Sequence, residues 1–92
     1  MLNIRDYAIP LGGTTLSQRK ELLALLLELD ELIHTYMAAT ITSVTYVPSS
    51  IIYLRYDGED WCRGGMMRKS ELLIEDFIAR FGNSPDTYGF EL

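Results

Sequence analysis

Few side chains in this sequence combine in a way that could perform catalysis or hold a metal. The chain has a single cysteine, Cys62, and a single histidine, His34. A nucleophilic cysteine needs a neighbouring base, and nothing in the sequence places His34 beside Cys62. A zinc site needs a set of three or four ligands, and His34 has only Asp30 and Glu31 within one helical turn. We therefore expect no catalytic residue, no cofactor and no metal site.

A glycine pair, Gly12-Gly13, stands before Thr14 and Thr15 near the start of an expected helix. Backbone N–H groups at such a position can bind a phosphate. The sequence lacks the lysine and the spacing of a Walker loop, however. We interpret these residues as the turn that caps the helix.

Three basic residues, Arg63, Arg68 and Lys69, form the group best suited to contact a nucleic acid. The expected order of elements around them, a helix, three strands and a helix, is similar to that of double-stranded RNA-binding domains. Glu71 follows them directly and two further acids lie in the same expected helix, so we infer no membership of that family. A dimeric regulator that binds nucleic acid through this patch is the alternative function.

The composition is that of an ordinary folded domain with an acidic balance. The 92 residues include 13 acidic and 8 basic side chains, which gives a formal net charge of −5, and 48% of them are apolar. Affinity for a phosphate backbone depends on Lys and Arg, so this balance argues against it. A domain of this size buries a thin core, and a partner or a second copy would add stability.

We expect one soluble domain, 1–92, with an N-terminal arm over 1–13 and a C-terminal tail over 83–92. The single cysteine excludes an intramolecular disulfide and favours a reducing compartment. The longest apolar run, Leu22 to Leu27, is far shorter than the roughly 20 residues of a membrane span. The first residues lack the layout of a signal peptide. These features predict a cytoplasmic protein.

An amphipathic pattern predicts a long first helix over 16–38. Thr15-Leu16-Ser17-Gln18 fits a capping box. Apolar residues then recur at spacings of three and four, at Leu22, Leu26, Leu29, Ile33 and Tyr36. Such a helix would be about 33 Å long, and its apolar surface is wider than one thin sheet would cover. We expect the flanking Leu23 and Leu27 to line a homodimer interface; burial within one chain is the alternative.

Residues with high strand propensity predict strands over 41–47 and 51–56, and Asp57-Gly58 favours a two-residue hairpin turn into a third strand. That turn would pair Tyr56 with Glu59 and Leu54 with Trp61. One face of the sheet would pack on the core, with Thr42, Val44, Tyr46, Ile52, Leu54, Tyr56 and Trp61. The other face would meet water, with Ser43, Thr45, Tyr53, Arg55, Asp60 and Cys62.

Gly64-Gly65 ends the third strand, and Ser70 is expected to cap a second helix over 71–81 that Gly82 terminates. The predicted fold class is therefore α+β. It is a two-layer domain with a three-stranded antiparallel sheet in the order α-β-β-β-α, a long N-terminal and a shorter C-terminal helix. The N-terminal arm could add an extra strand.

This fold presents a polar sheet face and an acidic turn to solvent. Together they carry the residues that we expect to bind a protein partner: Tyr53, Arg55, Asp57, Glu59 and Asp60. Tyr and Arg are common at interface hot spots. The sequence therefore predicts a small acidic non-enzymatic module, an adaptor or inhibitor that covers a partner surface. Small acidic accessory proteins of mobile elements that block host machinery offer an analogy for this role.

Overall fold

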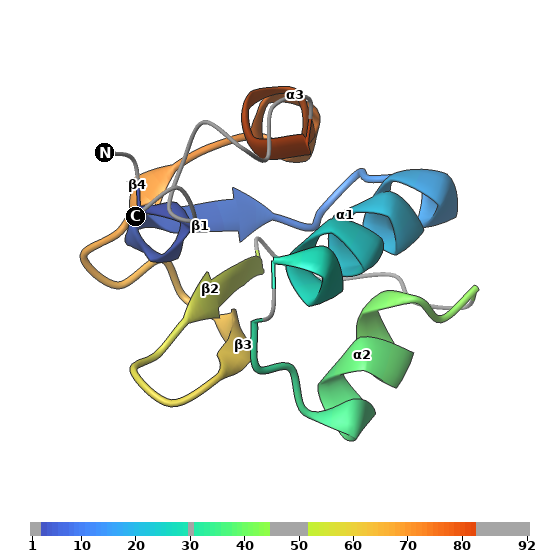
Figure 1. The fold of residues 1–92 in the computed structure, drawn as a ribbon, viewed down its shortest axis with the longest axis horizontal. Helices are drawn as coiled ribbons and strands as arrows, with labels where there is room; N and C mark the ends of the chain where they lie inside the picture. Colours follow the sequence, from blue (N-terminus) through green and yellow to red (C-terminus); the bar gives the residue numbers. More distant parts are fainter. Residues whose placement is uncertain (1–2, 30, 45–51, 83–92) are drawn as a thin grey trace.

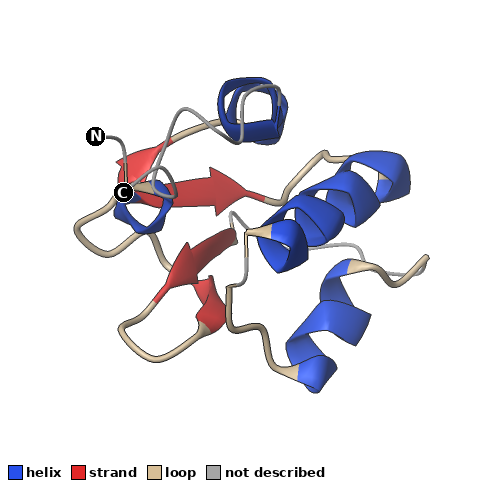
Figure 2. Ribbon diagram, viewed as in Figure 1, coloured by secondary structure: helices blue, strands red, loops and turns tan. Residues whose placement is uncertain are grey.

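The described residues form a four-stranded mixed sheet and three α-helices (Figure 1). A computed structural model describes residues 3–29, 31–44 and 52–82. The elements follow one another as η1 (Ile4–Asp6, a 3₁₀ helix), β1 (Tyr7–Pro10), α1 (Leu16–Glu28), α2 (Thr35–Ile41), β2 (Tyr53–Tyr56), β3 (Trp61–Gly64), β4 (Ser70–Glu71) and α3 (Ile74–Gly82). Figure 2 shows the same elements coloured by type. The predicted α+β class is confirmed.

The predicted three-stranded antiparallel sheet is wrong, because the N-terminal segment is a central strand. The strand order is β3-β2-β1-β4, in which β1 pairs antiparallel with β2 and parallel with β4. Ile9 lies opposite Leu54, and both side chains are fully buried. The alternation of apolar residues in this segment is incomplete because Ile4 belongs to a 3₁₀ turn and not to a strand. With two more elements before β2, the order no longer matches that of double-stranded RNA-binding domains.

The predicted helix over 16–38 is broken into two. α1 ends at Glu28, and the chain then runs alongside β3, where the Leu32 carbonyl accepts a hydrogen bond of 3.0 Å from the Trp61 N–H. His34 caps α2 through its Nδ1 atom, which accepts from the Tyr36 N–H. The apolar spacing continued across the break because Ile33 still packs against the core from an extended segment.

The predicted strand over 41–47 is not observed in the part of the chain that the structure describes. Ile41 is the last residue of α2, Thr42 to Val44 form a turn, and 45–47 lie outside the described residues. Thr40 and Thr42 fit the end of a helix because each hydroxyl donates to the carbonyl four residues earlier.

The β2–β3 hairpin is confirmed, but its register differs from the predicted one by two residues. Tyr56 pairs with Trp61 and Arg55 with Cys62, so the connection is a four-residue loop, 57–60. The Asp57 carboxylate stabilises this longer loop by accepting two of its backbone N–H groups. Because side chains alternate with a period of two, a shift of two residues leaves Tyr53, Arg55 and Cys62 on their predicted face. Asp60, predicted on that same face, lies in the loop instead.

The second helix begins three residues later than predicted. Ser70 and Glu71 form β4 beside β1, and the Leu72 N–H donates to the Ala8 carbonyl at 3.1 Å. Ser70 is therefore a strand residue and not the helix cap. The parallel pairing with β1 takes up backbone groups that a helix start would otherwise leave to water.

Aromatic and leucine side chains form the core between the sheet and the helices. Trp61 on β3 contacts Phe77 on α3 edge to face, with ring centroids 6.5 Å apart. The ring of Phe77 lies 4.8 Å from that of Phe81. Leu22 and Leu26 of α1 are fully buried in the same cluster. One face of β2 and β3 is therefore packed against the core, and this packing holds the backbone that carries the side chains of the opposite face.

Candidate functional site

The face of β2 and β3 that points away from the core carries polar side chains. Arg55 lies opposite Cys62 in the hairpin, and Tyr53 lies two residues before Arg55 on the same strand. Because neighbouring residues of a strand point to opposite faces, these three face away from the fully buried Leu54 and Trp61. All three are partly exposed. We call Tyr53, Arg55 and Cys62, together with Glu71, the polar sheet face.

Arg55 is held in one position on this face. Its Nε atom donates to the Gly65 carbonyl at 2.6 Å, and its Nη1 atom donates to the Cys62 sulfur at 3.0 Å. A Cβ atom on Gly64 would lie 2.6 Å from Nη2, so the guanidinium rests where only a glycine leaves room. Among the described residues, Nη2 has no hydrogen-bond acceptor. The side chain is thus fixed at Nε and Nη1, and its Nη2 atom remains as a hydrogen-bond donor.

Tyr53 and Glu71 meet across the central strand. The Tyr53 hydroxyl, on β2, donates to Glu71 Oε2, on β4, at 3.4 Å. Partial burial and then the negative charge of Glu71 raise the pKa of Tyr53 above its usual value. Sequence reasoning missed Glu71 as a site residue because it was expected in a helix. The parallel pairing of β4 with β1 places it here.

The three acidic residues of the hairpin loop have different surroundings. Asp57 Oδ1 accepts the N–H groups of Glu59 and Asp60 at 2.9 and 3.1 Å, and these bonds lower the pKa of its carboxyl. Glu59 is exposed, and Asp60 is partly buried. Asp57 therefore stabilises the loop, whereas Glu59 is open to a partner.

Cys62 lies between two charged groups but is not an activated nucleophile. Its sulfur accepts from Arg55 and lies 3.5 Å from Asp57 Oδ2, to which the thiol donates. Burial raises the pKa of the thiol, so it stays protonated near neutral pH. Within residues 3–29, 31–44 and 52–82, no cluster of three metal-ligating side chains occurs.

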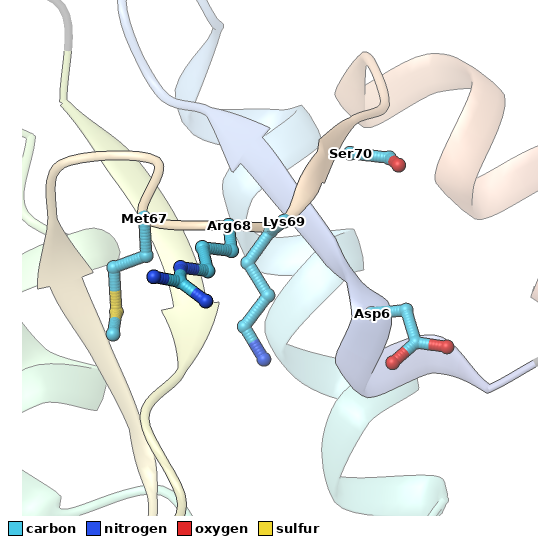
Figure 3. A pocket seen from close by; sticks show the side chains of 5 residues that line it. All are labelled: Asp6, Met67, Arg68, Lys69 and Ser70. Atoms are coloured by element: carbon cyan, nitrogen blue, oxygen red, sulfur yellow. The ribbon is translucent and has the colours of Figure 1, made fainter.

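The three basic residues predicted for nucleic-acid contact do not converge. Arg68 and Lys69 line an open hollow of about 570 Å³ with Asp6, Met67 and Ser70. Lys69 Nζ donates to the Arg5 carbonyl at 2.7 Å, and the Arg68 and Asp6 side chains point in different directions (Figure 3). Arg63 is exposed on β3 and is not part of the hollow's lining.

Leu23 and Leu27, predicted to line a homodimer interface, differ in their surroundings. Leu23 is partly buried and packs against the core, whereas 56% of Leu27 is exposed. Leu27 is therefore the more accessible of the two to a second copy.

Comparison with known proteins adds no family. A scan against protein-family models and searches of curated proteins and of solved structures gave no match. In the described ranges, no helix has the length and apolar character needed to cross a bilayer.

Proposed function

We propose that this protein is a small acidic binding module that covers the surface of a partner protein, as an adaptor or inhibitor and not as an enzyme. The observation that carries the proposal is the fixed guanidinium of Arg55 beside Tyr53 on an accessible sheet face. The polar sheet face is the proposed contact surface, and exposed Glu59 borders it.

Preorganisation is the reason that this face suits binding. An arginine loses rotamer freedom when a partner holds it, at a cost of about 0.5–1.5 kcal/mol. The bonds from Arg55 to Gly65 and Cys62 have already restricted this side chain on folding. Nη2 can then donate to a carboxylate or carbonyl of the partner without that cost, and the Tyr53 ring supplies rigid apolar area beside it.

Charge narrows the kind of partner. The net charge of −5 and the carboxylates of Glu59 and Glu71 around the face favour a partner whose contact surface is basic at its rim. Such a partner would associate faster at low salt. We also propose that the protein is cytoplasmic, a location with which the free thiol of Cys62 is consistent.

A capture experiment from lysate of the native organism, run with and without nuclease treatment, tests the proposal. Tagged wild type, Arg55→Ala, Tyr53→Ala and the control Lys20→Ala are compared, since Lys20 is exposed on α1. We expect a stoichiometric protein partner that Arg55→Ala and Tyr53→Ala retain at least about tenfold less well. Lys20→Ala should bind as wild type does.

Two outcomes would contradict this function. Equal capture by Arg55→Ala would show that the polar sheet face is not the contact surface. Capture of nucleic acid alone, lost on nuclease treatment and on charge reversal of Arg68 and Lys69, would instead support the nucleic-acid regulator. In that case Arg68 and Lys69, which share one hollow, would be the contact residues.

A further inference from the structure

The Tyr53 side chain reaches across the central strand of the sheet. Its hydroxyl, on β2, meets Glu71, on β4, and β1 lies between these two strands. Neighbouring residues of a strand point to opposite faces, so Ala8 of β1 lies on the face of Tyr53 while Ile9 points into the core. Ala8 is nevertheless fully buried. These positions indicate that the Tyr53 ring lies over β1, with one side toward Ala8 and the other toward solvent.

The Glu71 carboxylate, at the hydroxyl end of this ring, can accept further hydrogen bonds. Glu71 is exposed, and among the described residues only the Tyr53 hydroxyl donates to its carboxylate, at Oε2. The Arg55 guanidinium does not pair with it, because its Nε and Nη1 atoms donate to Gly65 and Cys62 on the β3 side of the face. An accessible aromatic ring and an open carboxylate oxygen therefore lie next to each other.

Another tyrosine and glutamate of this molecule already hold an arginine in such an arrangement. The Cζ atom of Arg5 lies 4.0 Å from the centroid of the Tyr56 ring. At the same time, Arg5 Nε and Nη2 donate to Glu31 Oε2 at 3.0 and 2.7 Å. The guanidinium is thus stacked on an aromatic face and paired with a carboxylate at its edge.

Tyr53 and Glu71 present the same two groups without an arginine. Within the part of the chain that the structure describes, arginines lie over the rings of Tyr56 and Tyr7, and none lies over that of Tyr53. The ring and the carboxylate are already held together by their own hydrogen bond. The site is therefore assembled before a guanidinium arrives.

We infer that Tyr53 and Glu71 bind an arginine side chain of the partner protein. This inference rests on the proposed function and names one side chain that the partner supplies. Arginine fits better than lysine, because a planar guanidinium can stack on the ring and donate from its edge at the same time. Arg55 would bind an acceptor of the same partner, so the partner's contact surface combines an arginine with a carboxylate or a carbonyl group.

Removal of the negative charge tests the site with the captured partner, once purified. In Glu71→Gln the amide oxygen still accepts from the Tyr53 hydroxyl, but the carboxylate is lost. We expect the dissociation constant to rise about tenfold or more. The matched control Glu21→Gln, exposed on α1, should bind as wild type does. Tyr53→Phe keeps the aromatic ring and should lose less affinity than Tyr53→Leu.

A small probe tests the same site without the partner. Ethylguanidinium and ethylammonium chloride are titrated separately into the full chain, up to about 50 mM because a single side chain binds weakly. The NMR signals of the Tyr53 ring report binding. We expect ethylguanidinium to shift these signals more than ethylammonium does, and we expect Glu71→Gln to abolish the difference.

The outcomes separate this inference from the proposed function. Capture lost in Arg55→Ala but unchanged in Glu71→Gln would leave the function standing and overturn the arginine site. Equal shifts from the two probes, or the same shift in wild type and Glu71→Gln, would also overturn it. Failure to capture any protein would contradict the proposed function, whereas a shift selective for ethylguanidinium would still support the site.

Discussion

Gly64 makes room for the guanidinium on which the proposed contact surface depends. Its missing side chain leaves the space that Arg55 Nη2 occupies, at 2.6 Å from where a Cβ would stand. Tyr53, two residues away on the same face, meets Glu71 across the central strand. At this scale the polar sheet face consists of two hydrogen-bonded pairs, Tyr53 with Glu71 and Arg55 with Cys62.

Gly64→Ala separates positioning from stability. The clashing atom belongs to the far end of a flexible side chain, so the guanidinium can move aside, and we expect the free energy of unfolding to change by less than about 1 kcal/mol. Partner capture should nevertheless fall as far as it does for Arg55→Ala. Gly65→Ala is the control, because no atom lies within 4 Å of its added Cβ. Capture unchanged by Gly64→Ala would show that the fixed position of Arg55 does not matter.

Asp57 should make the fold sensitive to acid. Its folded-state pKa lies below the usual value of about 3.9, because it accepts N–H groups from Glu59 and Asp60. Its contribution to stability is therefore complete above that usual value and is lost as the pH falls through the lower folded value. Thermal unfolding between about pH 2 and pH 7 should show a smaller loss in Asp57→Asn than in wild type. Parallel curves for the two proteins would assign the acid sensitivity to other carboxylates.

The helices depend on contacts that tie one element to another. Arg19, 4% exposed on α1, donates through Nε to the Ile41 carbonyl at 2.7 Å and through Nη2 to the Ser43 carbonyl at 3.2 Å. Its Nη1 atom donates to the Thr14 carbonyl at 2.7 Å. One side chain thus joins the start of α1 to the end of α2. The C-terminal end of α2 is held in place by this arginine.

Arg19→Ala should loosen α2. It removes charge-assisted bonds to three carbonyls and leaves a cavity, which we expect to cost about 3 kcal/mol in the free energy of unfolding, measured by urea denaturation. Hydrogen exchange should rise first in α2. Lys20→Ala, on the exposed side of the same helix, should leave both quantities unchanged. Faster exchange confined to the sheet would contradict this role.

At the scale of the whole molecule, charged side chains are distributed unevenly between the elements. The polar sheet face combines a fixed arginine with acidic neighbours, whereas α2 has no charged side chain. A homodimer, which the sequence analysis predicts, would carry two polar sheet faces in one particle. Binding to a partner with repeated sites would then gain from both contacts at once.

Features that depend on residues close together in the chain could be predicted from the sequence. Tyr53 and Arg55 lie on one face of the hairpin and Leu54 on the other, as predicted. The shift of the register by two residues did not change this, because side chains alternate between the faces with a period of two. The capping box of Thr15 and Gln18 is present for the same reason, since all its atoms lie within four residues.

The tertiary structure alone decided what depends on distant pairing. β1 is central because Ile9 meets Leu54, and Glu71 joins the site because β4 pairs with β1. The long predicted helix ends early because the Leu32 carbonyl bonds to Trp61, far along the chain. Sequence periodicity describes which side of a segment is apolar, while the choice between helix and strand is made by whichever neighbour takes up the backbone hydrogen bonds.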